Sequence, residues 1–105
     1  MIDNQMFTNL ENLLTWTAKR QQAIAANVAN LDTPGYRAKD YSFDSEFQEA
    51  RKFEVSTPVK SDGNNVNLER ELTESTKNGL QYITLVQFLN QKLRTLRASI
   101  TEGGK

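Results

Sequence analysis

Residues 26–36 read Ala-Asn-Val-Ala-Asn-Leu-Asp-Thr-Pro-Gly-Tyr, and this stretch decides how the chain is organised. Pro34 cannot continue a helix and pushes the residue before it toward an extended conformation. Pro34 and Gly35 suit the central positions of a type II turn, which needs a negative φ followed by a positive one. Asn30 is expected to take the left-handed conformation that ends a helix. The stretch therefore predicts a helix end followed by a turn motif, which comprises Thr33, Pro34, Gly35 and Tyr36.

The residues before this turn predict a long amphipathic helix from about Thr8 to Asn30. Thr8 or Asn9 is the expected N-cap, and Glu11 would face the positive end of the helix dipole. The start of the helix is therefore expected within the first ten residues of the chain.

The apolar residues of this helix recur at alternating four- and three-residue steps, with Thr17 and Gln21 as polar members of the seam. The apolar positions are Leu10, Leu14, Ile24, Val28 and Leu31. Such a stripe fits a helix that packs on its own domain and equally one that packs on neighbouring chains. Asn27 and Asn30 share the face of the last turn, where an amide can bond to a partner's backbone or face water.

Residues 37–61 form a mixed middle segment. Residues 41–43 alternate as a short extended stretch. The spacing of Phe47 and Ala50 is compatible with a short helix from Ser45 to Phe53, but the sequence leaves the conformation of residues 44–61 open. The carboxylates of the segment alternate with basic residues, as on a solvated face, so neither a metal site nor an acid–base site is expected there.

The last helix carries the strongest periodic signal. Its seam keeps the four–three alternation over more than four heptads, which is typical of a coiled coil. The members are Leu68, Leu72, Ser75, Gly79, Tyr82, Val86, Leu89, Leu93, Leu96 and Ile100. Residues 68–100 would span about 50 Å at 1.5 Å per residue, so this helix must protrude or pack on other chains. Asn65 or Asn67 is its expected N-cap, and Gly79 indicates either a close helix crossing or a tolerated imperfection.

Composition excludes several classes of protein. Lys+Arg and Asp+Glu are both 13, and the zero net charge argues against binding to nucleic acid or to an anionic membrane. The chain has no cysteine, no apolar run of transmembrane length and no cleavable signal at its N-terminus. No cofactor, metal or direct membrane insertion is expected.

Two motifs resemble those of the flagellar basal-body rod proteins. Residues 26–30 followed by residues 33–36 are similar to the N-terminal signature of bacterial rod and hook proteins. Residues 62–71, Tyr82 and residues 96–103 resemble the C-terminus of the family's proximal-rod member. Together the likeness covers about residues 8–43 and 62–103, and the chain is short for the family in between.

The resemblance implies a structural role without catalysis. Members of this family are exported unfolded through the flagellar type III export apparatus, without a cleaved signal. In the periplasm they assemble with themselves and other rod proteins into an axial tube that transmits torque and surrounds the export channel. The proximal member joins the MS-ring and export-gate end of the basal body to the next rod subunits.

The sequence thus predicts a mainly α-helical fold, in which two long terminal helices pair as an antiparallel coiled coil around a short irregular or extended middle. One assembly domain would comprise an N-terminal helix and turn (1–36), the middle segment (37–61) and a C-terminal helix (62–105). The predicted subunit-interface residues are Leu10, Leu14, Ile24, Asn27, Val28, Asn30, Leu72, Gly79, Tyr82, Val86, Leu89, Leu93, Leu96 and Ile100. A soluble helical-hairpin adaptor or chaperone is the alternative, and an enzyme that uses the carboxylates of residues 40–49 is a weaker one.

Overall fold

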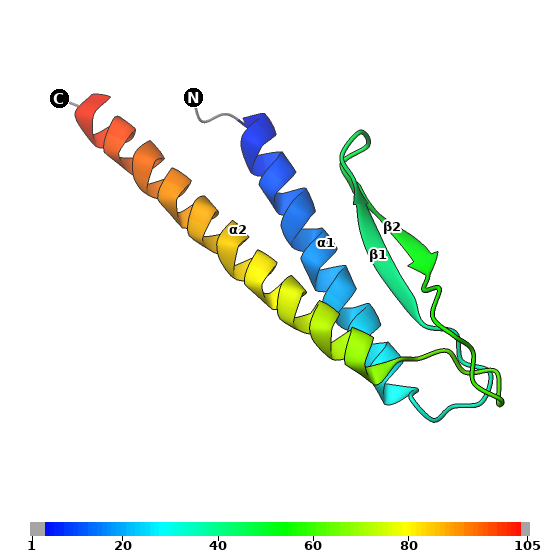
Figure 1. The fold of residues 1–105 in the computed structure, drawn as a ribbon. Coiled ribbons are helices and arrows are strands. Elements are labelled where there is room, and N and C mark those ends of the chain that lie inside the picture. Colours follow the sequence, from blue (N-terminus) through cyan, green and yellow to red (C-terminus); the bar gives the residue numbers. More distant parts are fainter. Residues whose placement is uncertain (1–3, 104–105) are drawn as a thin grey trace.

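The computed structural model describes residues 4–103 and consists of two long helices joined through a β-hairpin (Figure 1). Helix α1 spans Asn4–Ala29, strand β1 Lys39–Asp44, strand β2 Glu49–Glu54 and helix α2 Leu68–Gly103. The helices run antiparallel, so the two ends of the chain lie at the same end of the molecule, and α1 lies between α2 and the hairpin. This arrangement confirms the predicted fold class.

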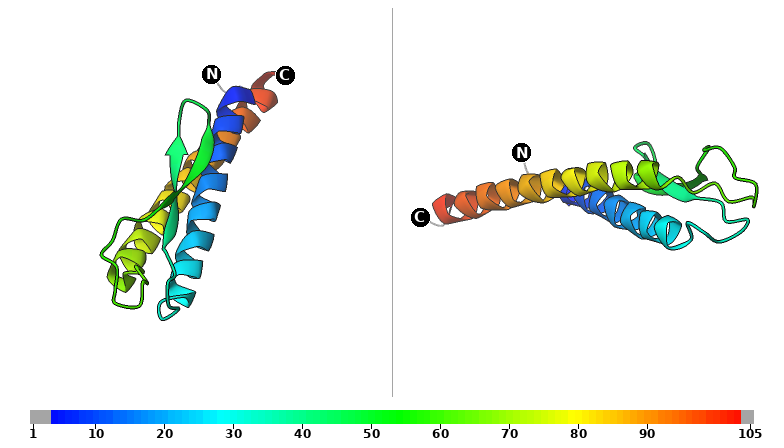
Figure 2. Two further views of the ribbon diagram at one scale, coloured as in Figure 1. Left: turned by 90° about the vertical axis from the view of Figure 1, so that its right-hand side faces the viewer. Right: turned by 60° about the horizontal axis from the view of Figure 1, so that its bottom comes forward.

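The molecule is elongated, with extents of 70 × 24 × 15 Å and a radius of gyration of 18.4 Å. A compact domain of about 100 residues has a radius of gyration of about 13 Å. The two helices lie close together near the turn motif and separate toward the termini, and the C-terminal part of α2 extends beyond α1 (Figures 1 and 2). The last helix therefore protrudes, as its length predicted.

The start of α1 differs from the prediction. The helix begins at Asn4, so Thr8 and Asn9 lie inside it and neither is the N-cap. Glu11 lies in the second turn, and Asn9 instead accepts a hydrogen bond from Gln5 Nε2 at 2.9 Å. The prediction was wrong because no glycine or proline before Thr8 prevents the helix from starting earlier.

The end of α1 is close to the prediction, but Asn30 ends the helix in another way. Gln48 is the only non-glycine residue with positive φ in the described chain, so Asn30 is not left-handed. Its backbone N donates to the oxygens of both Ala26 and Asn27 at 3.1 Å, and its Nδ2 donates to Ala26 O at 2.8 Å. Tightened backbone bonds and a side-chain cap thus replace the left-handed residue.

The turn motif adopts the predicted type II turn. Tyr36 N donates to Thr33 O at 3.2 Å, and Gly35, at the third position, has a φ of 76°. Gly35 N then donates to Asp62 O at 2.9 Å, which joins this turn to the loop before α2. A Cβ on Gly63 would lie 3.3 Å from the Cα of Gly35, so the two loops touch backbone to backbone.

The short helix considered from Ser45 to Phe53 does not form, because this stretch forms the turn and second strand of the hairpin. The Asp44 carboxylate accepts hydrogen bonds from the backbone N of Glu46 and of Phe47, at 3.0 and 3.2 Å. It thereby offers these amides a local partner that competes with a helix. Gln48, with a φ of 54°, closes the four-residue turn.

Trp16 attaches the hairpin to α1. Its Nε1 donates to Tyr41 O at 2.8 Å, and its ring lies 5.7 Å from that of Phe43. The extended stretch predicted at residues 41–43 is therefore confirmed as part of β1.

The buried hydrophobic core lies apart from the Trp16 contact, at the turn end of the molecule. Among residues 4–103 it comprises Ala38, Val55 and Val66, with Leu31 and Tyr36 packed against it, while Leu10 and Ile24 are buried separately on α1.

Candidate assembly interface

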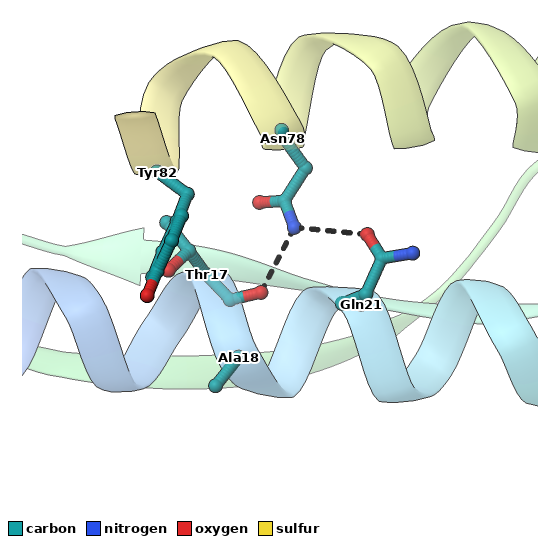
Figure 3. Close-up of a pocket in the computed structure, with 6 residues that line it drawn as sticks. Thr17, Ala18, Gln21, Asn78 and Tyr82 are labelled. Carbon is teal, nitrogen blue, oxygen red and sulfur yellow. Dashed lines mark hydrogen bonds between the residues drawn. The ribbon is translucent and has the colours of Figure 1, made fainter. Parts of the chain in front are cut away.

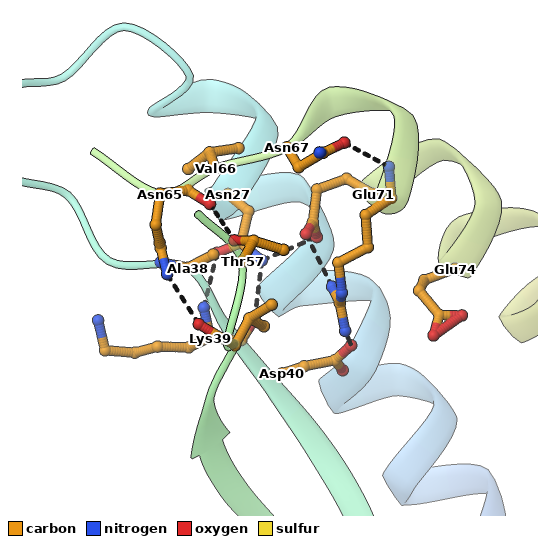
Figure 4. Close-up of polar contacts among 12 residues, drawn as sticks. Asn27, Ala38, Lys39, Asp40, Thr57, Asn65, Val66, Asn67, Glu71 and Glu74 are labelled. Atoms are coloured by element: carbon orange, nitrogen blue, oxygen red, sulfur yellow. Dashed lines mark hydrogen bonds and ion pairs between the residues drawn. The ribbon is translucent and has the colours of Figure 1, made fainter. Parts of the chain in front are cut away.

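Asn27 lies where α1, β1 and α2 meet and is completely buried. Its Nδ2 donates to Lys39 O at 2.7 Å and to Glu71 Oε1 at 2.8 Å, and its Oδ1 accepts from Lys39 N at 3.1 Å (Figure 4). One amide thus joins three elements and satisfies both backbone groups of the first residue of β1. No surface of this side chain remains for a second subunit, so the interface proposed below omits Asn27.

A buried ionic network, Arg20–Asp40–Arg70–Glu71, adjoins Asn27. Arg20 donates through Nε and Nη2 to the two carboxylate oxygens of Asp40, at 2.9 and 2.8 Å. Arg70 donates through Nη2 to Asp40 at 2.8 Å and through Nη1 to Glu71 at 2.7 Å. Both carboxylates are completely buried. The expectation that the middle carboxylates all lie on a solvated face is therefore wrong for Asp40, which arginines from both helices enclose.

The environment of Asp40 keeps its carboxylate ionised. Burial alone raises the pKa of this carboxyl, but hydrogen bonds from Arg20, Arg70 and Tyr41 N outweigh that effect and lower the pKa below its ordinary value. The hydrogen bond to Asp40 likewise raises the pKa of Arg20. Asp40 and Arg20 are therefore both charged at neutral pH.

This lowered pKa predicts a loss of stability in acid. An unfolded Asp has a pKa of about 3.9, so the contribution of Asp40 is complete above that pH and is lost as the pH falls through the lower folded pKa. We expect the urea midpoint of unfolding to fall between pH 5 and pH 2. Asp40→Asn should lose less over the same range, and an equal loss in the two proteins would contradict this prediction.

Two further buried residues, Asn64 and Asn65, form an asparagine clasp in the loop before α2. Asn64 Nδ2 donates to Asn30 O at 2.9 Å and to Thr33 O at 2.7 Å, and its Oδ1 accepts from Val66 N at 2.7 Å. The side chain therefore caps carbonyls at the C-terminal end of α1. The two halves of the chain are tied together at the turn motif.

Asn65 likewise forms hydrogen bonds that connect the residues next to the two strands with the loop before α2. Its Oδ1 accepts from Ala38 N at 2.6 Å, and its Nδ2 donates to Val55 O at 2.7 Å. Its backbone N donates to Tyr36 O, and its backbone O accepts from the hydroxyl of Thr57 (Figure 4). Asn67, not Asn65, is the N-cap of α2, since Asn67 Oδ1 accepts from Arg70 N at 2.9 Å.

Part of the apolar surface that the chain leaves uncovered follows one side of α2, while Leu80 and Phe88 are exposed on other sides of the same helix. Six exposed side chains fall within about 100° of one another around the helix at 100° per residue. This α2 stripe comprises Leu68, Leu72, Tyr82, Ile83, Leu93 and Ile100. Exposed apolar side chains that gather on one side of a helix are typical of a protein interaction site.

The structure divides the predicted interface residues between the inside and the outside of the chain. Leu10 and Ile24 are buried within it, whereas Val28 is exposed. Leu14, Asn30, Gly79, Val86, Leu89 and Leu96 are partly buried. The remaining members, Leu72, Tyr82, Leu93 and Ile100, are exposed in the α2 stripe.

The face of α2 that packs on α1 is more polar than the predicted seam. Asn78 Nδ2 donates to Thr17 O at 2.9 Å, and Gln21 Nε2 donates to Ser75 Oγ at 3.4 Å. Glu71 and Asn78 are the buried residues of α2, one heptad apart. The predicted seams included Thr17, Gln21 and Ser75 but missed Glu71 and Asn78, each of which lies one position before a predicted seam residue of α2.

Within residues 4–103, no helix combines the length and the hydropathy that a membrane crossing requires. The same residues contain no group of three or more His, Cys, Asp or Glu side chains placed to hold a metal ion.

Comparison with known proteins connects the turn and the helices to one family. The model of a family described as "Flagella basal body rod protein" matches residues 12–37, which include most of α1 and the turn motif. The flagellar basal body rod protein FlgB of Bacillus subtilis is 33% identical over 92% of this chain and 93% of its own length. FlgB of Aquifex aeolicus is 34% identical over 83% of this chain and 86% of its own. FlgB of Escherichia coli is 26% identical over 89% and 91%.

Proposed function

The chain belongs to the FlgB family of flagellar basal body rod proteins, and from this premise we propose that it is a structural subunit of the proximal part of the bacterial flagellar rod. The observation that carries the proposal is the likeness to FlgB along almost the whole of both chains. A role in an assembly also gives the α2 stripe a function, because a neighbouring subunit would cover it.

The interface we propose is smaller than the predicted one. It consists of the exposed and partly buried members of the predicted set, without Asn27, Leu10 and Ile24, whose side chains are buried within the chain. Leu14, Val28 and Asn30 would contribute from α1. From α2 would come Gly79, Val86, Leu89, Leu96 and the α2 stripe, which adds Leu68 and Ile83 to the predicted set.

The register of α1 and α2 rules out a contact within one chain between the C-terminal part of α1 and the C-terminal part of α2. Asn27 bonds to Glu71, and Leu93 lies more than 20 residues further along α2, or about 30 Å at 1.5 Å per residue. Ile24 and Val28 therefore cannot contact Leu93 or Leu96 of the same chain. Val28 can meet these leucines only if they belong to another subunit.

The location and partners follow from the same proposal. The subunit would pass through the flagellar type III export apparatus without a cleaved signal and assemble in the periplasm. There it would contact copies of itself, other rod proteins and the MS-ring and export-gate end of the basal body. Its role would be mechanical, with no catalytic step: it transmits torque and surrounds the export channel.

The alternative of a soluble helical-hairpin adaptor or chaperone accounts for the two helices but not for the likeness to FlgB, so it is not favoured. The alignment with the Bacillus subtilis protein runs over 121 positions, more than the 105 residues of this chain. The relative thus has residues that this chain lacks. Any rod contact made by those residues in longer relatives would be missing here.

Deletion of the gene in its bacterium tests the proposal. Electron microscopy of isolated basal bodies should show membrane rings without rods, and the wild-type gene should restore both rods and swimming. Complete rods in the deletion strain would refute the rod assignment and favour the adaptor. Restoration by the wild-type gene is the control for effects on neighbouring genes.

A further inference from the structure

A groove opens between α1 and α2 where the two helices begin to separate (Figure 3). Its volume is about 300 Å³, and its surface is mostly apolar. A water molecule occupies about 30 Å³ in the liquid, so the groove has room for a large side chain. The lining residues are Thr17, Ala18, Gln21, Asn78, Gly79 and Tyr82.

One polar atom at this groove has no partner within the chain. Asn78 is 2% exposed, and its Nδ2 donates to Thr17 O and to Gln21 Oε1. No donor among residues 4–103 reaches its Oδ1, which Figure 3 shows on the Tyr82 side of the amide. A buried acceptor without a hydrogen bond is unfavourable, so a donor that reached this oxygen from outside the chain would stabilise it.

Gly79 supplies a second, independent observation at the same groove. Glycine inside a helix is less stable than alanine, so a packing reason for it is expected. Within this chain there is none, because a Cβ added at Gly79 would meet no atom within 4 Å. The absence of a side chain therefore leaves room at the groove for a group from outside the chain.

The chain itself contains a segment that fits this site. Thr17 lies opposite Asn78, so Asn4, thirteen residues earlier, comes opposite about residue 91 of α2 by helix geometry. Residues 92–103, the α2 overhang, thus have no α1 residue of the described chain beside them. The overhang exposes apolar Leu93 and Ile100 together with Arg94 and Arg97.

The two arginines of the overhang provide donors for Asn78 Oδ1, which no donor of the groove reaches. Neither guanidinium forms an ion pair within the described range 4–103. A guanidinium carries five N–H donors, and its aliphatic stem packs well on apolar surface. The overhang therefore offers apolar side chains for the apolar surface of the groove and a donor for Asn78 Oδ1.

We propose that the groove at Asn78 and Gly79 receives the α2 overhang of a second copy of this chain, with an arginine donating to Asn78 Oδ1. The inference rests on the proposed rod function and names one of its contacts. Each copy has one groove and one overhang at different places along its length, so the contact is heterologous. Heterologous contacts that do not close into a ring produce open helical arrays, which suits an axial tube.

Filling the groove tests the proposal. Gly79→Leu should leave a folded monomer, since the added Cβ meets nothing and helix propensity rises. Its circular dichroism should match wild type, and its urea midpoint should be equal or higher, but basal bodies should lack rods. Gln81→Leu adds the same side chain on the opposite face of α2 and should build normal rods. Normal rods from folded Gly79→Leu would overturn the proposal.

A cross-link identifies the segment that lies in the groove. It also tests the proposed contact if Gly79→Leu does not fold. The chain has no cysteine, so the variant with Gly79→Cys and Arg97→Cys carries only the two introduced thiols. A short thiol cross-linker should produce a ladder of dimers, trimers and larger products in assembled rods. The control with Gln81→Cys and Arg97→Cys should give none.

Three results of the cross-linking would overturn the inference: no ladder, an equal ladder in the control, or a product that contains another rod protein. Dimers from Gly79→Cys alone would also overturn it, because they indicate a symmetric contact between grooves. These results leave the rod function itself intact. That function is refuted only by normal rods in the deletion strain.

Discussion

Asp40→Asn is expected to reduce the free energy of unfolding by about 3–5 kcal/mol, the usual effect of removing one partner from a buried ionic network. The substitution leaves the guanidinium groups of Arg20 and Arg70 close together without the shared carboxylate that both bind. Small domains are stable by only about 5–15 kcal/mol, so much of the stability would be lost. Urea unfolding followed by the fluorescence of Trp16, which contacts β1, measures the change.

Asp44→Asn is the matched control, since Asp44 lies at the other end of the same strand. It pairs with Arg51 at 2.8 Å, but both side chains are partly exposed, and such surface pairs contribute at most about 1 kcal/mol. Equal shifts for the two variants would mean that the buried network contributes no more than a surface ion pair.

Leu72→Asp is expected to abolish rod assembly while the single chain remains folded. Leu72 is 57% exposed, so the monomer loses little packing, and an acidic residue near the N-terminus of α2 suits the helix dipole. In the rod, the same position would bury a carboxylate against a neighbour, which is strongly unfavourable. Electron microscopy of basal bodies and circular dichroism of the purified variant measure the two effects separately.

Thr73→Asp places the same charge one residue further along, on another side of α2, where the residue is exposed and lies outside the α2 stripe. It should assemble rods as the wild type does. If Leu72→Asp also assembled normal rods, Leu72 would face solvent in the rod, and the stripe would not be an interface along its whole length.

Local signals account for the features that could be predicted from the sequence. Pro34 and Gly35 permit few backbone conformations other than a type II turn, and the long apolar repeat of α2 left no alternative to a helix. The hairpin could not be predicted from the spacing of Phe47 and Ala50, because that spacing also fits a helix. The Asp44 carboxylate, which binds amides of the turn, favours the strand arrangement.

The buried polar residues were harder to foresee because their partners lie far away in the sequence. Asn27 bonds to Glu71, 44 positions later, and nothing close to either residue reveals the pair. Gly79 was recognised as an irregular position, but only the structure shows that no atom of the chain occupies the space beside it.

The asparagine clasp also sets the order in which the protein can mature. Asn64 and Asn65 hold the end of α1, the turn motif and both edges of the small core, yet they follow all of these in the sequence. A chain that emerges from the ribosome N-terminus first, or threads through any narrow passage in that direction, cannot close this junction until more than half of its length is free. The end of α1 and the turn motif stay without these asparagine bonds until then, so closure of the junction is timed by chain emergence rather than by local helix formation, which takes only about a microsecond.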